Sequence, residues 1–164
     1  MAEIAREEVF EAIRRGYGDL ENASEDEILE FFQAKDIESL SGDINNIKGI
    51  LFEQEYARDL QEDGVDARLF EETNHPVSDI GIFEDGEMIE ELQLKATSNP
   101  SYIEETLGEM PEDVAVVTTS EVAEHFDGEV IDSGISDTVL EEAIGDMIIP
   151  ISPLSVVGWF FGIF

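Results

Sequence analysis

The spacing of the apolar residues changes at Gly64, and this change constrains the fold more than any other feature of the chain. Before Gly64 the apolar residues recur at steps of three and four, which is the period of an amphipathic helix. We predict helices over residues 2–15, 24–32 and 44–62. The second of these opens with Ser-x-x-Glu, the pattern of a capping box.

After Gly64 the apolar residues alternate with polar ones or form short continuous runs, as in strands. The stretch 84–87 contains the Asp-Gly pair of a two-residue hairpin turn. The sequence therefore predicts an α/β protein whose central elements follow the order helix, strand, strand, strand, helix, strand. The predicted elements after Gly64 are strands over 66–71, 77–83 and 88–96, a helix over 99–107, a strand over 113–118, helices over 120–125 and 137–147, and a short strand near Val130 and Ile131.

We expect one globular domain, in which a core (44–146) follows an N-terminal helical extension (1–43) and precedes a hydrophobic C-terminal tail (147–164). The tail carries no charge and is just long enough for a minimal membrane span, but its prolines would interrupt a helix. Three interpretations remain open: the tail packs into the core or against a partner, associates with a membrane, or begins a segment that continues. The N-terminus lacks the apolar region of a signal peptide, so we expect a cytoplasmic protein.

The balance of charge limits the conditions under which such a chain stays compact. Asp and Glu number 41 against 8 Lys and Arg, which gives a formal net charge of −33. Self-repulsion on this scale destabilises a folded chain and repels nucleic-acid phosphates, unless salt screens it. We favour a halophilic origin, with molar salt as the working medium. The alternative is an acidic protein that mimics nucleic acid or binds a basic partner.

Composition also excludes several kinds of site. The chain contains no Cys, so it has neither disulfides nor a thiolate nucleophile, and its two His are too far apart in sequence to predict a zinc site. The sequence has no basic patch with interleaved aromatic residues, so it does not predict sequence-specific readout of DNA.

One predicted strand carries an unusual polar face. Side chains alternate along a strand, so Glu91, Gln93 and Lys95 project to one side while the leucines between them project to the other. Asp79 lies on the preceding strand of the same hairpin, where it can face these three. Such groups need a metal ion, a cleft or each other, because burying them without partners is costly.

Oxygen ligands suit Mg²⁺ or Mn²⁺, and Mg²⁺ keeps several waters. Asp79 offers a carboxylate, Gln93 an amide oxygen and Leu94 its backbone carbonyl, while Glu53 could hold a metal-bound water or a second ion. Lys95 would either orient and help deprotonate an attacking water or neutralise charge that develops on a phosphorane-like transition state.

Lys48-Gly-Ile-Leu-Phe-Glu53, Pro76-Val-Ser-Asp79 and Glu91-Leu-Gln-Leu-Lys95 occur in this order along the chain. With the order of the elements, they resemble the motif set of the PD-(D/E)XK nuclease superfamily. The resemblance implies a restriction-endonuclease-like αβββαβ core and a metal-dependent endonuclease that hydrolyses phosphodiester bonds, with DNA as the expected substrate and a homodimer as a possible assembly. The chain has Gln93 where the superfamily usually has an acid, which lowers the expected metal affinity.

A second class of function remains open. Glu-x-Gln-x-Lys alone is common in half-exposed strands, and Asp79 could simply begin a turn. The chain would then be a non-catalytic acidic nuclease-fold protein that binds a basic partner or mimics nucleic acid. Four further residues have weaker functional interpretations. His75 could touch a phosphate or the substrate, although we favour a capped loop histidine. Lys48 and Arg58 could meet a backbone phosphate, although we favour ion pairs with helix neighbours such as Glu55 or Glu62. Tyr102 could stack on a base, although we favour a packing role.

Overall fold

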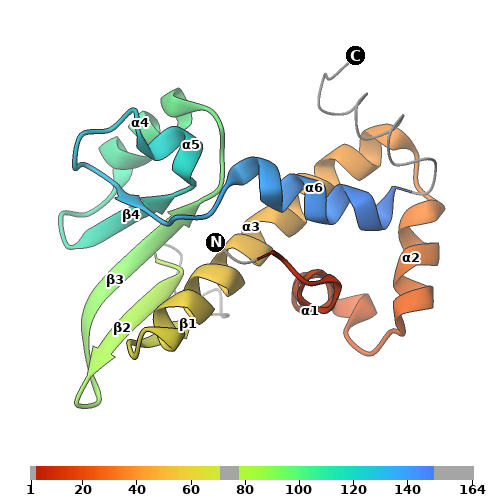
Figure 1. Cartoon of the computed structure of the whole chain (residues 1–164), viewed down its shortest axis with the longest axis horizontal. Helices are drawn as coiled ribbons and strands as arrows, with labels where there is room; N and C mark the ends of the chain where they lie inside the picture. The colour runs from red at the N-terminus through yellow and green to blue at the C-terminus, as the bar shows by residue number, and fades with distance from the viewer. Residues whose placement is uncertain (1–2, 71–77, 150–164) are drawn as a thin grey trace. The chain divides into compact units, whose positions relative to one another are not determined.

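The computed structural model describes residues 3–70 and 78–149 (Figure 1). The chain divides into two compact units: residues 52–137 form one, and residues up to Leu51 combine with those from Thr138 onward to form the other. The predicted core, 44–146, has wider limits than the first unit. The predicted assignment of 1–43 and 147–164 to an extension and a tail stays a prediction.

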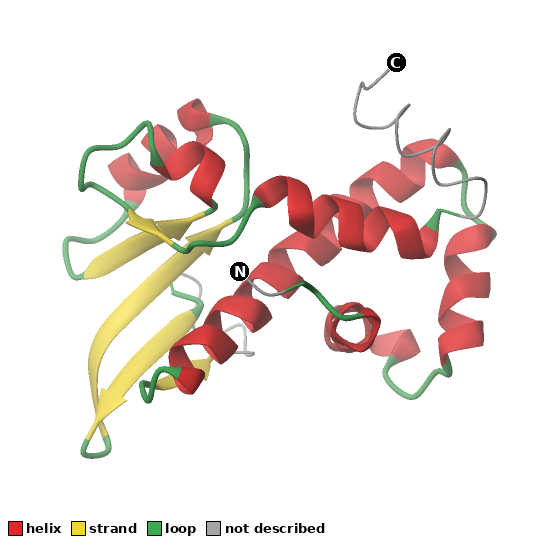
Figure 2. Ribbon diagram, viewed as in Figure 1, coloured by secondary structure: helices red, strands yellow, loops and turns green. Residues whose placement is uncertain are grey.

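The first unit contains a mixed sheet of five strands in the order β1-β2-β3-β4-β5 (Figure 2). The pairs β1·β2 and β2·β3 are antiparallel, whereas β3·β4 and β4·β5 are parallel. The α/β class and the predicted order of the central elements are confirmed. The elements of this unit are the end of α3, β1 (Asp66–Leu69), β2 (Ile80–Glu84), β3 (Glu87–Lys95), α4 (Pro100–Glu109), β4 (Val114–Thr118), α5 (Ser120–Ala123) and β5 (Ile131–Asp132).

The hairpin between β2 and β3 turns through two residues, Asp85 and Gly86, which have φ values of 52° and 82°. A turn with positive φ at both positions matches the right-handed twist of the flanking strands, as the Asp-Gly pair predicts. At the start of β3, Glu87, Met88 and Glu90 pair with β2, and the register shifts at Ile89; pairing with β4 begins only at Glu91. In this stretch Met88 is 44% exposed and Ile89 57% exposed.

Close packing in the sheet requires a glycine at position 81. A Cβ atom there would lie 2.5 Å from the Phe70 ring and 3.0 Å from the Phe83 ring. We expect Gly81→Ala to lower the free energy of unfolding by about 1–3 kcal/mol, the usual cost of overpacking, measured by denaturant unfolding in molar salt. Gly108→Ala is the matched control, because nothing lies within 4 Å of its added Cβ in helix α4. Equal stability of the two variants would contradict the packing explanation.

The second unit is helical, and its elements include α1 (Arg6–Gly16), the 3₁₀ turn η1 (Gly18–Leu20), α2 (Glu25–Gln33), most of α3 (Ile37–Glu62) and α6 (Asp137–Ile148) from Thr138 onward. The capping box is present: Glu27 N–H donates to Ser24 Oγ at 3.1 Å, and Ser24 N–H donates to Glu27 Oε1 at 3.1 Å. The predicted second helix is therefore confirmed at its first turn.

Helix α3 begins at Ile37, so the predicted start at residue 44 is wrong. Ser39 N–H donates to the Asp36 carboxylate at 2.8 Å, which satisfies a free N–H of the first turn. Gly42 lies inside the helix, at a cost of about 1 kcal/mol relative to alanine. Gly108 likewise lies inside α4 and does not end it, so that predicted end is also wrong.

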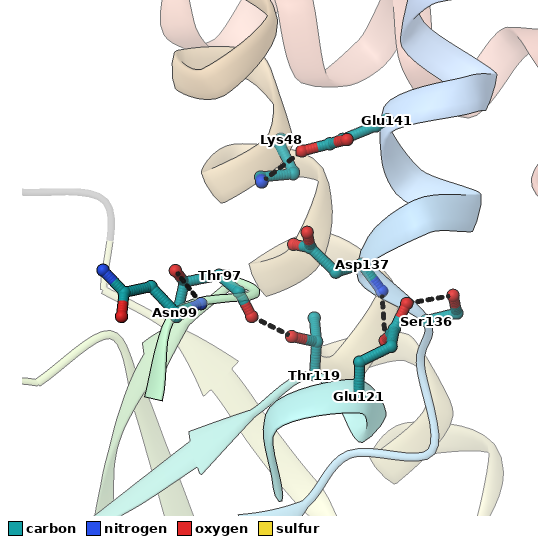
Figure 3. Close-up of polar contacts among 8 residues, drawn as sticks. All are labelled: Lys48, Thr97, Asn99, Thr119, Glu121, Ser136, Asp137 and Glu141. Atoms are coloured by element: carbon teal, nitrogen blue, oxygen red, sulfur yellow. Dashed lines mark hydrogen bonds and ion pairs between the residues drawn. The ribbon is translucent and has the colours of Figure 1, made fainter. Parts of the chain in front are cut away.

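Lys48 is 6% exposed and forms an ion pair of 2.8 Å with Glu141 on α6 (Figure 3). This partner lies on another helix, and the expected pairing of Lys48 with a neighbour on α3 stays a prediction. Arg58 does pair with its neighbours, at 2.6 Å to Glu55 and 4.0 Å to Glu62.

Within residues 3–70 and 78–149, no helix is long and apolar enough to cross a membrane. The predicted tail begins inside α6, which continues to Ile148. Residues 150–164, on which the three interpretations of the tail depend, lie outside the described residues.

Candidate active site

The register of the hairpin sets Asp79 opposite Gln93. Ile80 pairs with Leu92 in the antiparallel β2·β3 ladder, so the next pair toward the start of β2 is Asp79 and Gln93. The Asp79 N–H donates to the Leu92 carbonyl at 2.8 Å, which extends the ladder one residue beyond β2. Side chains of opposed residues share a face, and Gln93 Nε2 donates to Asp79 Oδ2 at 2.9 Å. The predicted contact between these two side chains is present.

Leu94 fixes the same carboxylate through its backbone. Its N–H donates to Asp79 Oδ2 at 2.8 Å, because β2 starts too late to supply a strand partner at this position. The N–H and C=O groups of a strand residue point to the same side, so the Leu94 carbonyl is directed toward the Asp79 side of β3. The sequence predicted a role for this carbonyl, but it did not reveal the role of the N–H.

Glu53 reaches the site from helix α3, and its carboxyl group forms a hydrogen bond with Asp79. Burial raises the pKa of Asp79 above its usual range, while the Leu94 N–H, the charge of Lys95 and the Glu53 hydrogen bond oppose this rise. Two adjoining carboxyl groups therefore meet in a partly buried place where a positive charge would be stabilised.

Lys95 projects from β3 two residues after Gln93, on the same face. Its ammonium forms no ion pair with any described residue, whereas Lys35 pairs with Asp43 and Lys48 with Glu141, both at 2.8 Å. The charge of Lys95 acts on the nearby Asp79 carboxylate without a direct ion pair, so the ammonium remains available to a ligand. The Lys95 ammonium lies 5.6 Å from the centroid of the Tyr102 ring.

A pocket of about 270 Å³ opens between Lys95 and helix α4. Tyr102 belongs to its wall and is 45% exposed. The choice between packing and stacking on a base stays a prediction for this residue. The residues that line the pocket are Gln93, Lys95, Tyr102, Glu105, Thr106, Glu109 and Met110.

Several residues that the sequence did not single out support the site. Buried Ser78 donates to Glu91 Oε1 at 2.9 Å, which ties the third polar residue of β3 to the segment before Asp79. At the end of β4, Thr118 Oγ1 donates to the Lys95 carbonyl at 2.8 Å. The next residue, Thr119, donates through Oγ1 to the Thr97 carbonyl at 2.9 Å (Figure 3). The sequence signal that could have identified these two residues is a pair of threonines, Thr118 and Thr119, at the end of a buried apolar strand.

Figure 3 also shows how the segment after β5 is held. Glu121 accepts hydrogen bonds from the Asp137 N–H at 2.8 Å and from Ser136 Oγ at 2.7 Å. These contacts fix the start of α6. His75, which was expected in a loop near Asp79, lies outside the described residues.

The predicted oxygen donors for a hard divalent cation are the carboxylates of Asp79 and Glu53, the amide oxygen of Gln93 and the carbonyl of Leu94. Gln93 turns its Nε2 and not its oxygen to Asp79, so the two carboxylates and the Leu94 carbonyl are the donors on the Asp79 side. Among the described residues, no group of three or more His, Cys, Asp or Glu side chains is arranged to hold a metal ion. Mg²⁺ commonly uses one or two carboxylates and keeps waters in its remaining positions. The donor set therefore fits Mg²⁺ or Mn²⁺ with water ligands and does not fit an ion that needs an all-protein cage.

No protein-family model, curated protein or solved structure in the comparisons matches the chain significantly. The resemblance to the nuclease superfamily therefore depends on the motif residues and the order of the elements.

Proposed function

We propose that this protein is a Mg²⁺- or Mn²⁺-dependent endonuclease that hydrolyses phosphodiester bonds, with a restriction-endonuclease-like core and DNA as substrate. The observation that carries the proposal is the meeting of Asp79, Gln93 and Glu53 beside Lys95, which has no ion pair among the described residues. These residues come from a helix, from the residue before β2 and from β3, and the sequence predicted all four.

Each residue has a definite role in the proposed reaction. Asp79 and Glu53 bind the cation, and the Gln93 amide and the Leu94 N–H hold the Asp79 carboxylate in place. When bound, the cation supplies positive charge against the phosphate and a more acidic water. Lys95 donates a hydrogen bond to a phosphate oxygen or to the attacking water, and its charge opposes the negative charge that develops in the transition state.

The acidic composition supports a salt-dependent enzyme. A net charge of −33 repels a polyanionic substrate at low ionic strength, and the Debye length shortens to about 3 Å in molar salt. The proposed setting is the cytoplasm of a halophile, where activity rises with salt until screening is complete. A homodimer would bring two such sites to one duplex.

A second candidate has its own supporting observation. The exposed acids Glu105 and Glu109 border the Lys95 pocket, and carboxylates there would oppose binding of a phosphate backbone. In this case the protein is a non-catalytic acidic relative of nucleases that binds a basic protein.

Removal of divalent metal tests the first candidate. We expect the full chain in molar KCl to cleave labelled DNA with millimolar Mg²⁺ or Mn²⁺ and to lose this activity in EDTA. Metal should also raise the melting temperature in the same salt, because a ligand that binds only the folded state stabilises it. Absence of cleavage of DNA and RNA in either metal at every salt concentration, together with tight binding of a basic protein, would replace the first candidate with the second.

A further inference from the structure

The pocket beside Lys95 has features that the proposed hydrolysis does not explain. It holds about 270 Å³, somewhat less than the roughly 300–1,000 Å³ typical of pockets for drug-sized ligands. A space of this size accepts one small planar group but not a duplex. The pocket shares Gln93 and Lys95 with the candidate active site, so its occupant would lie next to the reacting phosphate.

Tyr102 gives the pocket an aromatic wall. The ring is 45% exposed, and its turn of α4 is tied by a hydrogen bond of 2.9 Å from Thr106 Oγ1 to the Tyr102 carbonyl. The Lys95 ammonium lies 5.6 Å from the ring centroid, within the range of a cation–π contact. An exposed ring held beside the reacting lysine offers a surface on which a base can stack.

The polar groups of the pocket suit a base better than a phosphate. Glu105 and Glu109 repel a phosphate, but carboxylates accept hydrogen bonds from the exocyclic amino groups of bases. Gln93 is only 7% exposed, and its amide nitrogen is directed to Asp79. The Gln93 amide oxygen accepts no hydrogen bond from a described residue and remains available to a donor in the pocket.

High salt further favours a base over a phosphate as the occupant of the pocket. Affinity that comes from phosphate contacts falls steeply as salt rises, and Lys95 is the only cation among the residues that line the pocket. Under conditions that screen a charge of −33, stacking and hydrogen bonds must supply most of the affinity.

We infer that the pocket receives one unpaired base beside the scissile phosphate, so that the substrate is single-stranded or has an unpaired end rather than a continuous duplex. This inference rests on the proposed nuclease function and names the substrate class of the same site. The base stacks on Tyr102, the carboxylates of Glu105 and Glu109 and the amide of Gln93 face its edge, and Lys95 contacts the adjoining phosphate.

Binding without catalysis tests the inference. The full chain, in molar KCl with EDTA, is titrated into a single-stranded oligonucleotide that carries 2-aminopurine, whose fluorescence falls when it stacks, and into the matching duplex. We expect the single strand to bind more tightly, Tyr102→Phe to bind within about 3-fold of wild type, and Tyr102→Leu to bind about 5- to 150-fold more weakly. Equal affinity for single strand and duplex, or unchanged binding by Tyr102→Leu, would overturn the inference.

A parallel cleavage assay separates the two proposals. If Mg²⁺-dependent cleavage is found but duplex is cut as fast as single strand, and Tyr102→Leu cuts both normally, the base pocket is wrong while the nuclease stands. If Tyr102-dependent stacking of the single strand is found but nothing is cleaved in either metal, the pocket stands as a binding site while the nuclease is wrong.

Discussion

Replacing Lys95 with methionine is expected to lower kcat for metal-dependent cleavage by about 100- to 1,000-fold, the usual cost of removing one group that stabilises transition-state charge. Methionine keeps most of the length of the side chain but removes the ammonium. The fold should tolerate the change, because the ammonium forms no ion pair with a described residue whose carboxylate would be left alone. Single-turnover cleavage with saturating metal measures the effect without product release.

Lys35→Met is the control for this substitution. Lys35 pairs with Asp43 at 2.8 Å in the helical unit, so its loss removes the same charge from the chain at a different place. We expect wild-type cleavage for this variant at a temperature where it remains folded. Cleavage by Lys95→Met within 3-fold of wild type would rule out the role proposed for the ammonium.

Replacing Asp79 with asparagine is expected to lower cleavage by about 100-fold or more and to make the protein more stable near neutral pH. The loss of activity follows from removal of a carboxylate that binds the cation. Asparagine can still accept the hydrogen bonds that Gln93 Nε2 and the Leu94 N–H now donate to Oδ2, so the hairpin should keep its geometry.

The sign of the stability change follows from the raised pKa of Asp79, whose largest cause is burial. The folded chain binds this proton more tightly than the unfolded chain. The stabilisation is therefore complete below the unfolded pKa and is lost as pH rises through the folded pKa. Asparagine carries no charge at any pH, so the gain in the free energy of unfolding appears at pH values above that window.

Thermal unfolding across a pH series, with and without Mg²⁺, measures both effects. Glu104→Gln is the control, because Glu104 is an exposed acid of α4 that does not line the pocket. Mg²⁺ should raise the melting temperature of wild type and Glu104→Gln but not of Asp79→Asn. An equal response of all three would show that the cation only screens the general negative charge.

Local signals predicted the elements that matter most for the site. The Asp-Gly pair determines a two-residue turn, and alternation along β3 then sets Gln93 and Lys95 on one face, with Asp79 opposite Gln93. The contact between Asp79 and Gln93 follows from turn chemistry and strand period alone. The approach of Glu53 followed from the resemblance and from its place on a helix before the strands.

Other features depend on contacts that sequence spacing does not encode. Lys48 pairs with Glu141, 93 residues away, and no helical period predicts such a partner. The predicted start of α3 at residue 44 was wrong, because the hydrogen bond from the Ser39 N–H to Asp36 supports an earlier first turn and the helix continues through Gly42. The donation from the Leu94 N–H to Asp79 depends on where β2 begins relative to β3, which is a matter of strand length.

The exposed start of β3 presents a row of backbone groups that no described strand pairs with on the side away from β2. An open edge that carries Met88 and Ile89 could add strands from other copies of the chain. Glu87 and Glu90 flank these apolar residues, and antiparallel self-pairing would set carboxylate against carboxylate. Charged side chains on an exposed strand edge disfavour pairing with a second copy of the same strand, so these acids would oppose aggregation through the hairpin.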